Sequence, residues 1–534
     1  MKKTLIRLLS IVLILVMTVS CFAGCGGSDD NDGGKQAVKT NEKGMYDVKK
    51  LTPVKAAEMK MVNGRPVIYH NGEPYHYYSM HLRWDHILGA YSEDDYRMKL
   101  YEEGFKIIKE SGFETVILYL SWARLFDGEK YDFSELEMHY ELAKKYDLKV
   151  HLNWFGYNVC GFGGFMPWQT DYEKYPRLNG MDGAPLMTEG GYYVPDFSQQ
   201  IFIDEVTEAL QQVCAWLNVN DTDRRTVAIQ LENEPGNEEG GRGLWMSQFL
   251  NFAALLDAEG KAIKEGPYSM ITYLNLMSAG YNKEADGYDF NGRLKYLTTL
   301  KYVDIVGYDD YTTNPNPNLK NLEYNDNLAT YAEYSPASYA VPGQVNQIFS
   351  KGYGLSFYQV ANFRDLGSPG FYRFNNPVTG VEKRDGTKKL NPNTISPSLS
   401  EALELDVDEL VTMNKAIKAL RELIITEKIS NIIAFNNTVK NDVDAMKLCN
   451  KQKIKYHYSE PSKPYGGTGL VIGAKDGNFY LYSSRPASYE FASEIAEVTT
   501  GSYKDGKWTE SGKVTVNGKT FKVEPGLAYR VVLK

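Results

Sequence analysis

The feature that most constrains the fold of this chain is an alternation of strand-forming and helix-forming segments, repeated along much of its length. Runs rich in β-branched and aromatic residues, such as Thr115–Leu120, precede segments with apolar residues at helical spacing, such as Leu136–Tyr146. Such units indicate parallel strands joined by helical crossovers. The predicted strands are 75–84, 115–120, 148–154, 226–231, 270–276, 303–308, 328–332 and 355–360.

This pattern predicts an α/β fold, a (β/α)8 TIM barrel, over residues 56–435. A doubly wound parallel sheet is the alternative, but no glycine-rich phosphate loop follows the first strand. Two Asn-Gly turns, at Asn63-Gly64 and Asn71-Gly72, predict a hairpin ahead of the barrel. A long helix, 406–426, is expected to close it.

The last part of the chain, residues 436–534, has a different pattern. Its clearest signal is alternation from Val514 to Val523 around an Asn-Gly turn, which predicts a β-hairpin. We therefore expect a small antiparallel, β-sandwich-like domain after the barrel. Such a domain either binds carbohydrate or serves as a stabilising appendage.

The N-terminus has the pattern of a secretory signal over residues 1–25, in which basic residues precede the apolar run Leu8–Val19. The run Phe22–Cys25 resembles the lipobox of bacterial lipoproteins, and this resemblance implies that Cys25 is acylated. An ordinary cleaved signal is the alternative. Residues 26–55 are then expected to form a flexible tether. Together these features predict a secreted lipoprotein, anchored by its lipid to the outer face of the cell membrane.

Composition narrows the classes of partner and cofactor. The net charge of −9 argues against nucleic acid or anionic lipid as the main partner. The high Tyr and Trp content suits a protein that stacks on sugar rings, although Tyr-rich cores are common. Beyond the signal, Cys160, Cys214 and Cys449 lie too far apart to imply disulfides or metal ligation. No histidine motif with metal-ligand spacing is present, so we predict no metal and no cofactor.

The segment Gln230–Gly236 carries the strongest candidate for chemistry. It ends the predicted strand 226–231 and turns at once at Pro235-Gly236. A TIM barrel places its reactive groups at the carboxyl ends of its strands. Glu234 is therefore a candidate reactive group, and Asn233 is a candidate hydrogen-bonding partner for a substrate hydroxyl. The alternative is that Asn233 caps the turn and Glu234 is merely solvated.

A second carboxylate, Glu333, lies at the end of the seventh predicted strand and precedes a loop with Pro336. It follows Glu234 by 99 residues, which is three units of about 30 residues in a barrel of typical size. The fourth and seventh strands end on opposite sides of one barrel mouth. Two facing carboxylates are what glycosidic bond cleavage requires.

The segment Gln230–Gly236 is similar to the Gln-Val-Glu-Asn-Glu-Tyr-Gly signature of family 35 β-galactosidases, and Asn-Glu at the fourth strand is typical of clan A glycoside hydrolases. The run Ser79–Arg83 resembles the first-strand motif of that family. Trp122 with Lys130–Phe133 resembles its second-strand region, and Gly163–Trp168 resembles its Gly-Gly-x-Pro-x-Trp loop. Together the motifs also resemble family 42.

The resemblance implies that Glu234 is the acid/base and Glu333 the nucleophile of a retaining enzyme, with carboxyl groups about 5–5.5 Å apart. Two departures, at 123–126 and 153–157, leave the sugar open between β-galactoside and β-glucan types. The residues expected to bind substrate are Asn233, Asn153, Trp154, Trp168, Tyr308, Arg83 and Trp122.

Several of these residues have a second interpretation. Asn153 equally fits a turn role, and Trp154 and Trp168 equally fit packing in a loop core. Asp309, at the end of the sixth predicted strand, either contacts substrate or is solvated. Glu232 is expected on the same face as Glu234 but one layer deeper, paired with Arg83 or Arg124.

The sequence thus favours a retaining, exo- or endo-acting β-glycosidase that takes an oligo- or polysaccharide at the cell surface. The alternative from another class is a non-catalytic glycan-binding lipoprotein built on a degenerate barrel. A solute-binding protein of a transporter would also fit the lipobox, but it predicts two α/β lobes. The presence of both Glu234 and Glu333 favours the enzyme.

Overall fold

The computed structural model describes residues 39–84, 94–157, 171–180, 183–187, 193–234, 246–277, 290–310, 322–334, 341–358, 397–436, 446–458 and 467–534. The chain divides into two compact units, Met1–Lys39 and Thr40–Lys534, and every helix and strand below belongs to the second. The expected signal and its Cys25 lie outside the described residues. No helix in the described part of the chain is both long and apolar enough to cross a membrane.

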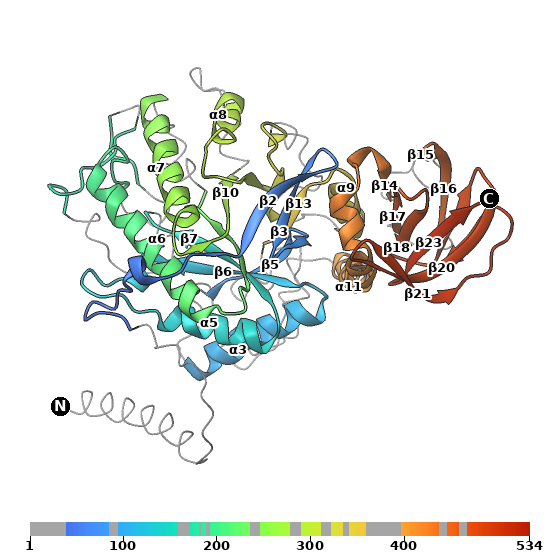
Figure 1. Cartoon of the computed structure of the whole chain (residues 1–534), viewed down its shortest axis with the longest axis horizontal. Coiled ribbons are helices and arrows are strands. Elements are labelled where there is room, and N and C mark those ends of the chain that lie inside the picture. The colour runs from blue at the N-terminus through green and yellow to red at the C-terminus, as the bar shows by residue number, and fades with distance from the viewer. Residues whose placement is uncertain are drawn as a thin grey trace, which may run out of the picture. The chain divides into compact units, whose positions relative to one another are not determined.

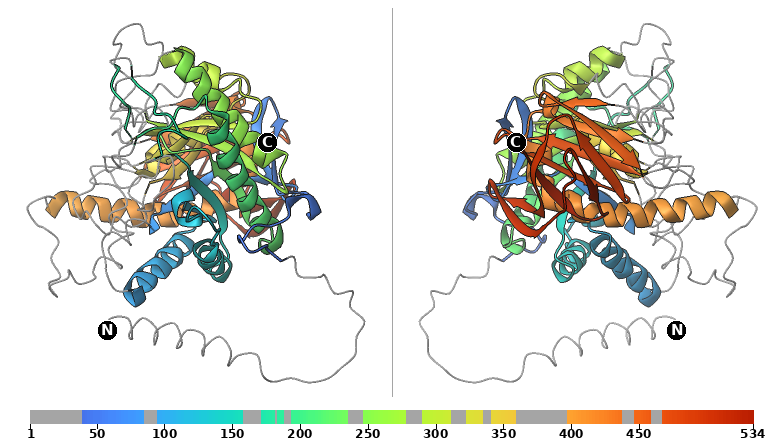
Figure 2. Two further views of the ribbon diagram at one scale, coloured as in Figure 1. Left: turned by 90° about the vertical axis from the view of Figure 1, so that its left-hand side faces the viewer. Right: turned by 90° about the vertical axis from the view of Figure 1, so that its right-hand side faces the viewer.

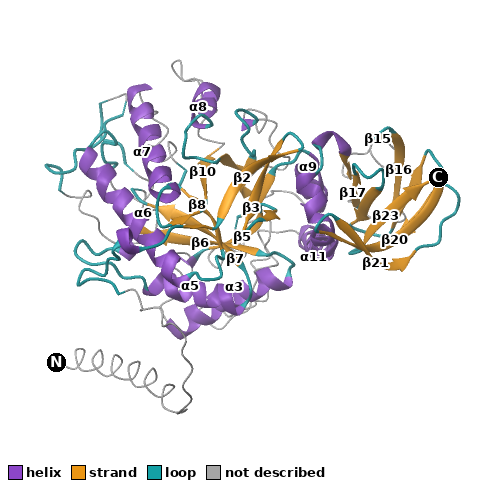
Figure 3. Ribbon diagram, viewed as in Figure 1, coloured by secondary structure: helices purple, strands orange, loops and turns teal. Residues whose placement is uncertain are grey.

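Eight parallel strands form a closed barrel, in the order β10-β11-β12-β13-β5-β6-β7-β8 (Figure 1). Helices cover the outside of the strands, as Figure 3 shows by colour. The predicted TIM barrel is confirmed, and all eight strand segments are present. The barrel strands are β5 (Tyr78–Leu82), β6 (Thr115–Ser121), β7 (Lys149–Phe155), β8 (Thr226–Gln230), β10 (Ile271–Met277), β11 (Ile305–Asp310), β12 (Thr330–Tyr334) and β13 (Gly354–Phe357).

Side chains alternate between the barrel interior and the helical layer, because a strand turns successive residues to opposite faces. Inside, the rings of Tyr77 and His151 lie 4.8 Å apart, and Tyr273 packs against Tyr77 at 5.9 Å. Outside, apolar residues pack against the surrounding helices. These helices are α3 (Asp94–Glu110), α4 (Trp122–Leu125), α5 (Ser134–Lys145), α6 (Gln200–Asn220), α7 (Met246–Lys264), α8 (Phe290–Leu297) and α9 (Val341–Ser350).

A three-stranded antiparallel sheet precedes the barrel: β2 (Ala57–Val62), β3 (Arg65–His70) and β4 (Glu73–Tyr75). Its two turns are the predicted Asn-Gly pairs, and all four turn residues have positive φ, as two-residue hairpin turns require.

The segment before this sheet differs from the expected tether. Strand β1 (Val54–Lys55) pairs with β9 (Tyr268–Ser269), and the Tyr46 amide donates to Gln212 in α6 at 2.7 Å. Tyr46 and the segment Val54–Lys55 therefore contact the barrel domain, although they lie within the expected tether 26–55.

The C-terminal part forms two antiparallel sheets around a core of its own. The first strand of the larger sheet, β14 (Ile432–Asn436), begins four residues before the expected boundary at 436. The larger sheet has the order β14-β17-β18-β23-β20-β21 and the smaller one β15-β16-β19-β22. The other strands are β15 (Lys447–Cys449), β16 (Gln452–Tyr458), β17 (Thr468–Gly473), β18 (Phe479–Ser483), β19 (Ala487–Phe491), β20 (Ile495–Lys504), β21 (Lys507–Lys513), β22 (Thr520–Val523) and β23 (Ala528–Leu533).

Helix α11 (Pro397–Thr426) lies between the barrel and the larger C-terminal sheet (Figure 1), and Figure 2 shows its length in orange from the two ends of the molecule. On the barrel side, its Asn414 accepts a hydrogen bond from Tyr78 at 2.9 Å. On the sheet side, its Glu422 accepts one from the Gly506 amide at 3.0 Å. The helix extends nine residues further toward the N-terminus than the predicted 406–426 and ends where predicted.

Candidate active site

The turn after β8 carries Glu234 in an unusual backbone conformation. Glu232 has φ +55° and Glu234 has φ +41°, in the left-handed region that non-glycine residues rarely adopt. Such residues cost about 1–3 kcal/mol each and persist where the surrounding structure holds them, often at functional sites. Here Gln230 contributes, because its side-chain amide donates to the Glu232 carbonyl at 2.8 Å and to Asn233 Oδ1 at 3.1 Å.

Glu333 lies near the end of β12 and is 3% exposed. The hydroxyl of Tyr119, in β6, donates to its Oε1 at 3.4 Å, and His81 Nδ1 lies 3.9 Å from the same oxygen. Burial lowers the pKa of His81 to about 3, so this imidazole is neutral and forms no ion pair. Its Nε2 lies 3.0 Å from the Ala332 carbonyl, which can only accept, so Nε2 carries the proton.

The ends of β11 and β12 are irregular where the site begins. Asp309 in β11 pairs in register with Glu333, and the register shifts between Tyr308 and Asp309. A second shift lies between Tyr331 and Tyr334, where β12 pairs with β13. Such irregularities re-aim side chains next to active sites. The two shifts flank the strand ends that carry Asp309 and Glu333.

Three carboxylates meet at the carboxyl end of the barrel. One oxygen each of Glu234, Asp309 and Glu333 lies within 4.8 Å of the other two. All three side chains are buried, with Glu234 the most exposed at 8%. The structure thus brings together the two predicted carboxylates and adds Asp309, for which the sequence left open a contact with substrate or a solvated position.

Amide side chains lie in the strands around these acids. Asn153, in β7, accepts a hydrogen bond from the Tyr273 hydroxyl at 2.5 Å. Its Nδ2 atom has no hydrogen-bond partner among the described residues, and the same holds for both amide atoms of Asn275 in β10. We did not identify Asn275 from the sequence. Its signal was a polar residue two positions after the inward-facing Tyr273, and therefore on the same face of the strand.

Arg83 follows β5 at the same end of the barrel. Its guanidinium lies 4.5 Å from the centre of the Tyr119 ring, and its Nη1 donates to the Tyr358 hydroxyl at 2.5 Å. Tyr119 is the residue that contacts Glu333. Arg83 therefore places a positive charge two contacts away from that carboxylate.

The two tryptophans predicted to bind substrate within the described residues lie in the core. Trp122 and Trp154 are at most 1% exposed, and their rings are 6.3 Å apart. Their burial indicates packing between strands and helices rather than stacking on a sugar. Trp168 lies outside the described residues. Tyr308 is in β11, pairing with Leu276, and its side chain is outside the described part.

The expected orientation of Glu232 is wrong. The positive φ of Glu232 breaks the strand alternation from which we inferred that it shares a face with Glu234. Its carboxylate instead accepts hydrogen bonds from the backbone amides of Gly156 and Tyr157. Arg124, one of its two expected partners, donates to Glu135 at 2.5 Å.

The three mouth carboxylates are also spaced as oxygen ligands of a divalent cation are. Their spacing alone does not distinguish a metal site from a pair of catalytic acids with a neighbour. The expectation that no metal takes part therefore stays a prediction, and adding a chelator to an activity assay tests it.

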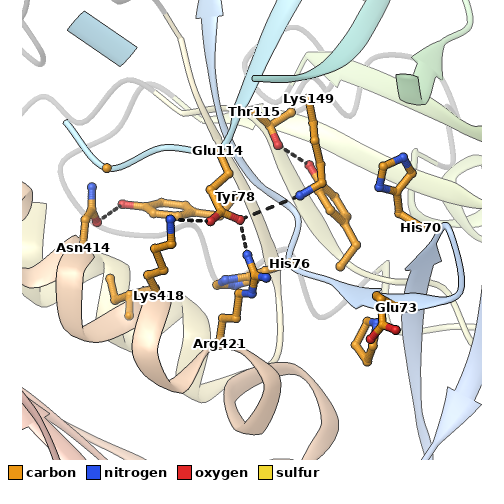
Figure 4. A pocket seen from close by; sticks show the side chains of 14 residues that line it. His70, Glu73, His76, Tyr78, Glu114, Thr115, Lys149, Asn414, Lys418 and Arg421 are labelled. Atoms are coloured by element: carbon orange, nitrogen blue, oxygen red, sulfur yellow. Dashed lines mark hydrogen bonds and ion pairs between the residues drawn. The ribbon is translucent and has the colours of Figure 1, made fainter. Parts of the chain in front are cut away.

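A cavity of about 70 Å³ lies at the opposite, N-terminal end of the barrel, away from these carboxylates. Figure 4 shows Glu114, directly before β6, between Lys149, Lys418 and Arg421. Lys418 Nζ lies 2.9 Å from Glu114 Oε1, and Arg421 pairs with the other oxygen. TIM-barrel enzymes carry their chemistry at the other end, so we expect this network to contribute to stability.

No protein-family model matches the chain, and no curated protein matches it. Among solved structures, it is similar to a family 39 glycoside hydrolase from Bacteroides cellulosilyticus WH2, with TM-score 0.42 and 11% identity, covering 88% of this chain and 84% of that one. It is also similar to a β-galactosidase from the psychrophilic Marinomonas ef1, with TM-score 0.41 and 10% identity, covering 64% of this chain and 60% of that one. A third similar structure is a β-1,4-D-mannanase from Cryptopygus antarcticus, with TM-score 0.39 and 10% identity, covering 62% of this chain and 98% of that one.

Proposed function

We propose that this chain is a retaining glycoside hydrolase that cleaves β-linked glycosides. The observation that carries the proposal is the approach of Glu234 and Glu333 oxygens to within 4.8 Å at the carboxyl end of a closed barrel. Retaining glycosidases hold their two carboxyl groups about 5–5.5 Å apart, whereas inverting enzymes leave about 6.5–9.5 Å for a water molecule. The close approach of one oxygen from each group supports the shorter, retaining separation, in which a carboxylate attacks the sugar directly.

In this mechanism, Glu333 attacks the anomeric carbon while the bond to the leaving oxygen breaks, and Glu234 gives that oxygen a proton. Water then attacks the glycosyl-enzyme, Glu234 takes its proton, and Glu333 is released. The assignment of the acid to Glu234 rests on the resemblance of its segment to clan A enzymes. The Tyr119 hydroxyl lies 3.4 Å from one Glu333 oxygen and 3.2 Å from the unprotonated Nδ1 of His81. When it donates to Glu333, it holds one carboxylate oxygen and leaves the other to attack.

The polar amides around the acids fit a sugar. Asn153 and Asn275 supply buried amide atoms that hydroxyl groups can satisfy, and buried polar atoms of this kind are normally hydrogen-bonded. We therefore propose an oligo- or polysaccharide substrate of β-galactoside or β-glucan type.

The proposal is tested by incubating the purified protein with β-galactans, β-glucans and mannans, and with the matching aryl β-glycosides. We expect release of reducing sugar from one class and trapping of Glu333 by the corresponding 2-fluoro glycoside, read by peptide mass spectrometry. Binding without any hydrolysis across this panel would instead support the glycan-binding alternative.

We further propose that the protein is held at the outer face of the cell membrane by a lipid on Cys25. The support is the run Phe22–Cys25 and the polar residues after it. Mass spectrometry of the mature N-terminus should find a diacylated Cys25. Cys25→Ser should move the protein out of the membrane fraction. A mature chain that starts elsewhere, without lipid, contradicts this.

A further inference from the structure

Two carboxyl side chains that the proposed mechanism does not use are buried next to the active-site turn. Glu232 belongs to the turn after β8, and Glu259 lies in the third quarter of helix α7. Both are 0% exposed. Two ionised carboxylates at this place would repel each other and offer each other acceptors only. A single proton between them turns the contact into a hydrogen bond.

Glu232 has the environment of the charged partner. Its carboxylate accepts the Gly156 amide at 3.0 Å and the Tyr157 amide at 3.1 Å, both just beyond the end of β7. A Cβ at position 156 would lie 2.0 Å from Glu232 Oε1, so only glycine permits this approach. Backbone amides stabilise the ionised form of a carboxyl group.

Glu259 has the environment of the protonated partner. Both of its carboxyl oxygens are buried and have no hydrogen-bond partner among the described residues. Burial, followed by the charge of Glu232, raises its pKa well above the ordinary range. The indole of Trp154, from β7, acts in the opposite direction and is the other polar group that faces it. Among the described groups, Glu232 is the one whose charge acts on Glu259, so this pair holds one proton near neutral pH.

We propose that Glu232 and Glu259 share one proton and together position Glu234, by fixing the β8 turn between the end of β7 and helix α7. The three elements meet at the Glu232 carboxylate, which lies two residues from Glu234. The pair supplies the external support that a turn with two left-handed residues requires. Glu232 and Glu259 are positioning residues, since neither reaches the reacting atoms. The kinetic consequence rests on the proposed function, whereas the shared proton does not.

The shared proton is tested by urea unfolding of the unsubstituted protein and of Glu259→Gln between pH 5 and 8. The native protein keeps a proton on Glu259 that the unfolded chain releases above about pH 4.3. The unsubstituted protein should therefore lose stability as pH rises, by up to tenfold in the folding constant per pH unit, relative to Glu259→Gln. Glu141→Gln, an exposed carboxyl on α5, should show no such change. A difference between Glu259→Gln and the unsubstituted protein that stays constant with pH overturns the shared proton.

The positioning role is tested by amide hydrogen exchange in folded protein. Glu259→Leu, which removes the donor, should speed exchange in the peptides that contain residues 155–157 and 230–234 by at least tenfold. Glu259→Gln retains a donor toward Glu232 and should leave exchange in these peptides within about threefold. Equal protection in all three proteins overturns the positioning role, whether or not a substrate is known.

Activity gives a further readout once a substrate is found. Glu259→Leu should lower kcat at least tenfold at nearly unchanged KM, and Glu259→Gln should restore most of it. Each kcat is calculated per active site, as titrated with the 2-fluoro glycoside, so that unfolded protein does not lower the measured value. A lack of turnover in the unsubstituted protein contradicts the proposed function alone, because the unfolding and exchange experiments still decide this inference.

Discussion

Carboxylates lie at both ends of the barrel, but their neighbours differ. At the N-terminal end, Glu114 lies between Lys149, Lys418 and Arg421 (Figure 4). Burial alone would raise its pKa, but the charges of Arg421 and Lys149 and the hydrogen bond from Lys418 lower it below the ordinary range. Glu114 is therefore ionised and paired with positive charges, and it connects helix α11 to the N-terminal ends of the barrel strands.

At the carboxyl end, three acids are placed next to one another. Oxygens of Glu234, Asp309 and Glu333 lie within 4.8 Å, and the imidazole nearest to Glu333 is neutral. The comparison separates an acid that is paired with cations from acids to which the proposed function assigns the chemistry. Substitutions at the two ends should therefore affect different measurements.

The largest effect is expected for Glu333→Gln at the mouth. Loss of the attacking carboxylate should lower kcat about 10⁴-fold or more, as loss of a nucleophile does elsewhere. The melting temperature should stay equal or rise, since one of three adjacent acids is removed. The glycoside assay and a thermal scan measure both, with Glu141→Gln as the exposed control. A large fall in melting temperature would break the contrast between the two ends.

A smaller loss is expected for Asn153→Ala, next to these acids. Removal of its amide should lower kcat/KM about 10- to 100-fold, the range for a lost buried hydrogen bond to substrate. Tyr273→Phe removes the hydrogen bond from Tyr273 to Asn153 but keeps the amide, so it should retain more activity. If both substitutions cost the same, Asn153 acts through Tyr273 and not through the sugar.

At the N-terminal end, Glu114→Gln should destabilise the protein by about 1–2 kcal/mol, between the values for exposed and buried ion pairs. The pKa of Glu114 is lower in the folded state than in the unfolded chain. Its contribution to the free energy of unfolding is therefore fully present when the pH is above the ordinary pKa of Glu, and it is lost as the pH falls through the folded-state pKa. The stability difference from the unsubstituted protein should thus vanish in acid, while kcat at neutral pH stays unchanged. A loss of activity without a loss of stability would contradict the comparison.

The smallest effect is expected for Trp122→Phe, in the core between strands and helices. Because Trp122 is buried against Trp154, the substitution should cost about 1 kcal/mol of stability through lost packing. KM should not change. A rise in KM at unchanged stability would indicate that Trp122 contributes to the substrate site after all.

Much of the fold follows from local patterns in the sequence. The barrel strands could be predicted because each is a short apolar run followed by helical spacing, and the two Asn-Gly turns ahead of the barrel because few residues tolerate positive φ. Glu234 and Glu333 could be placed at strand ends for the same reason. The barrel then brings them together, since the carboxyl ends of all its strands lie on one side. The two-stranded hairpin predicted from Val514 to Val523 is wrong, because β21 pairs with β20 whereas β22 pairs with β19 in the other sheet.

Other features depend on contacts between distant residues or on backbone geometry that no local pattern encodes. The meeting of Glu232 with Glu259 depends on the rotation of α7 and on the positive φ of Glu232. The position of Trp154 could have been inferred, however. Adjacent strand residues point to opposite faces, so Asn153 and Trp154 cannot both face the barrel interior.

The account depends most on the claim that Glu234 and Glu333 act by double displacement. The direct measurement is the configuration of the first-formed product, followed by proton NMR while a β-glycoside is hydrolysed. The account predicts that the β-anomer appears first and then mutarotates, because two inversions at the anomeric carbon restore its configuration. An α-anomer as the first product would contradict it, since that outcome requires a water molecule, rather than Glu333, to attack the anomeric carbon.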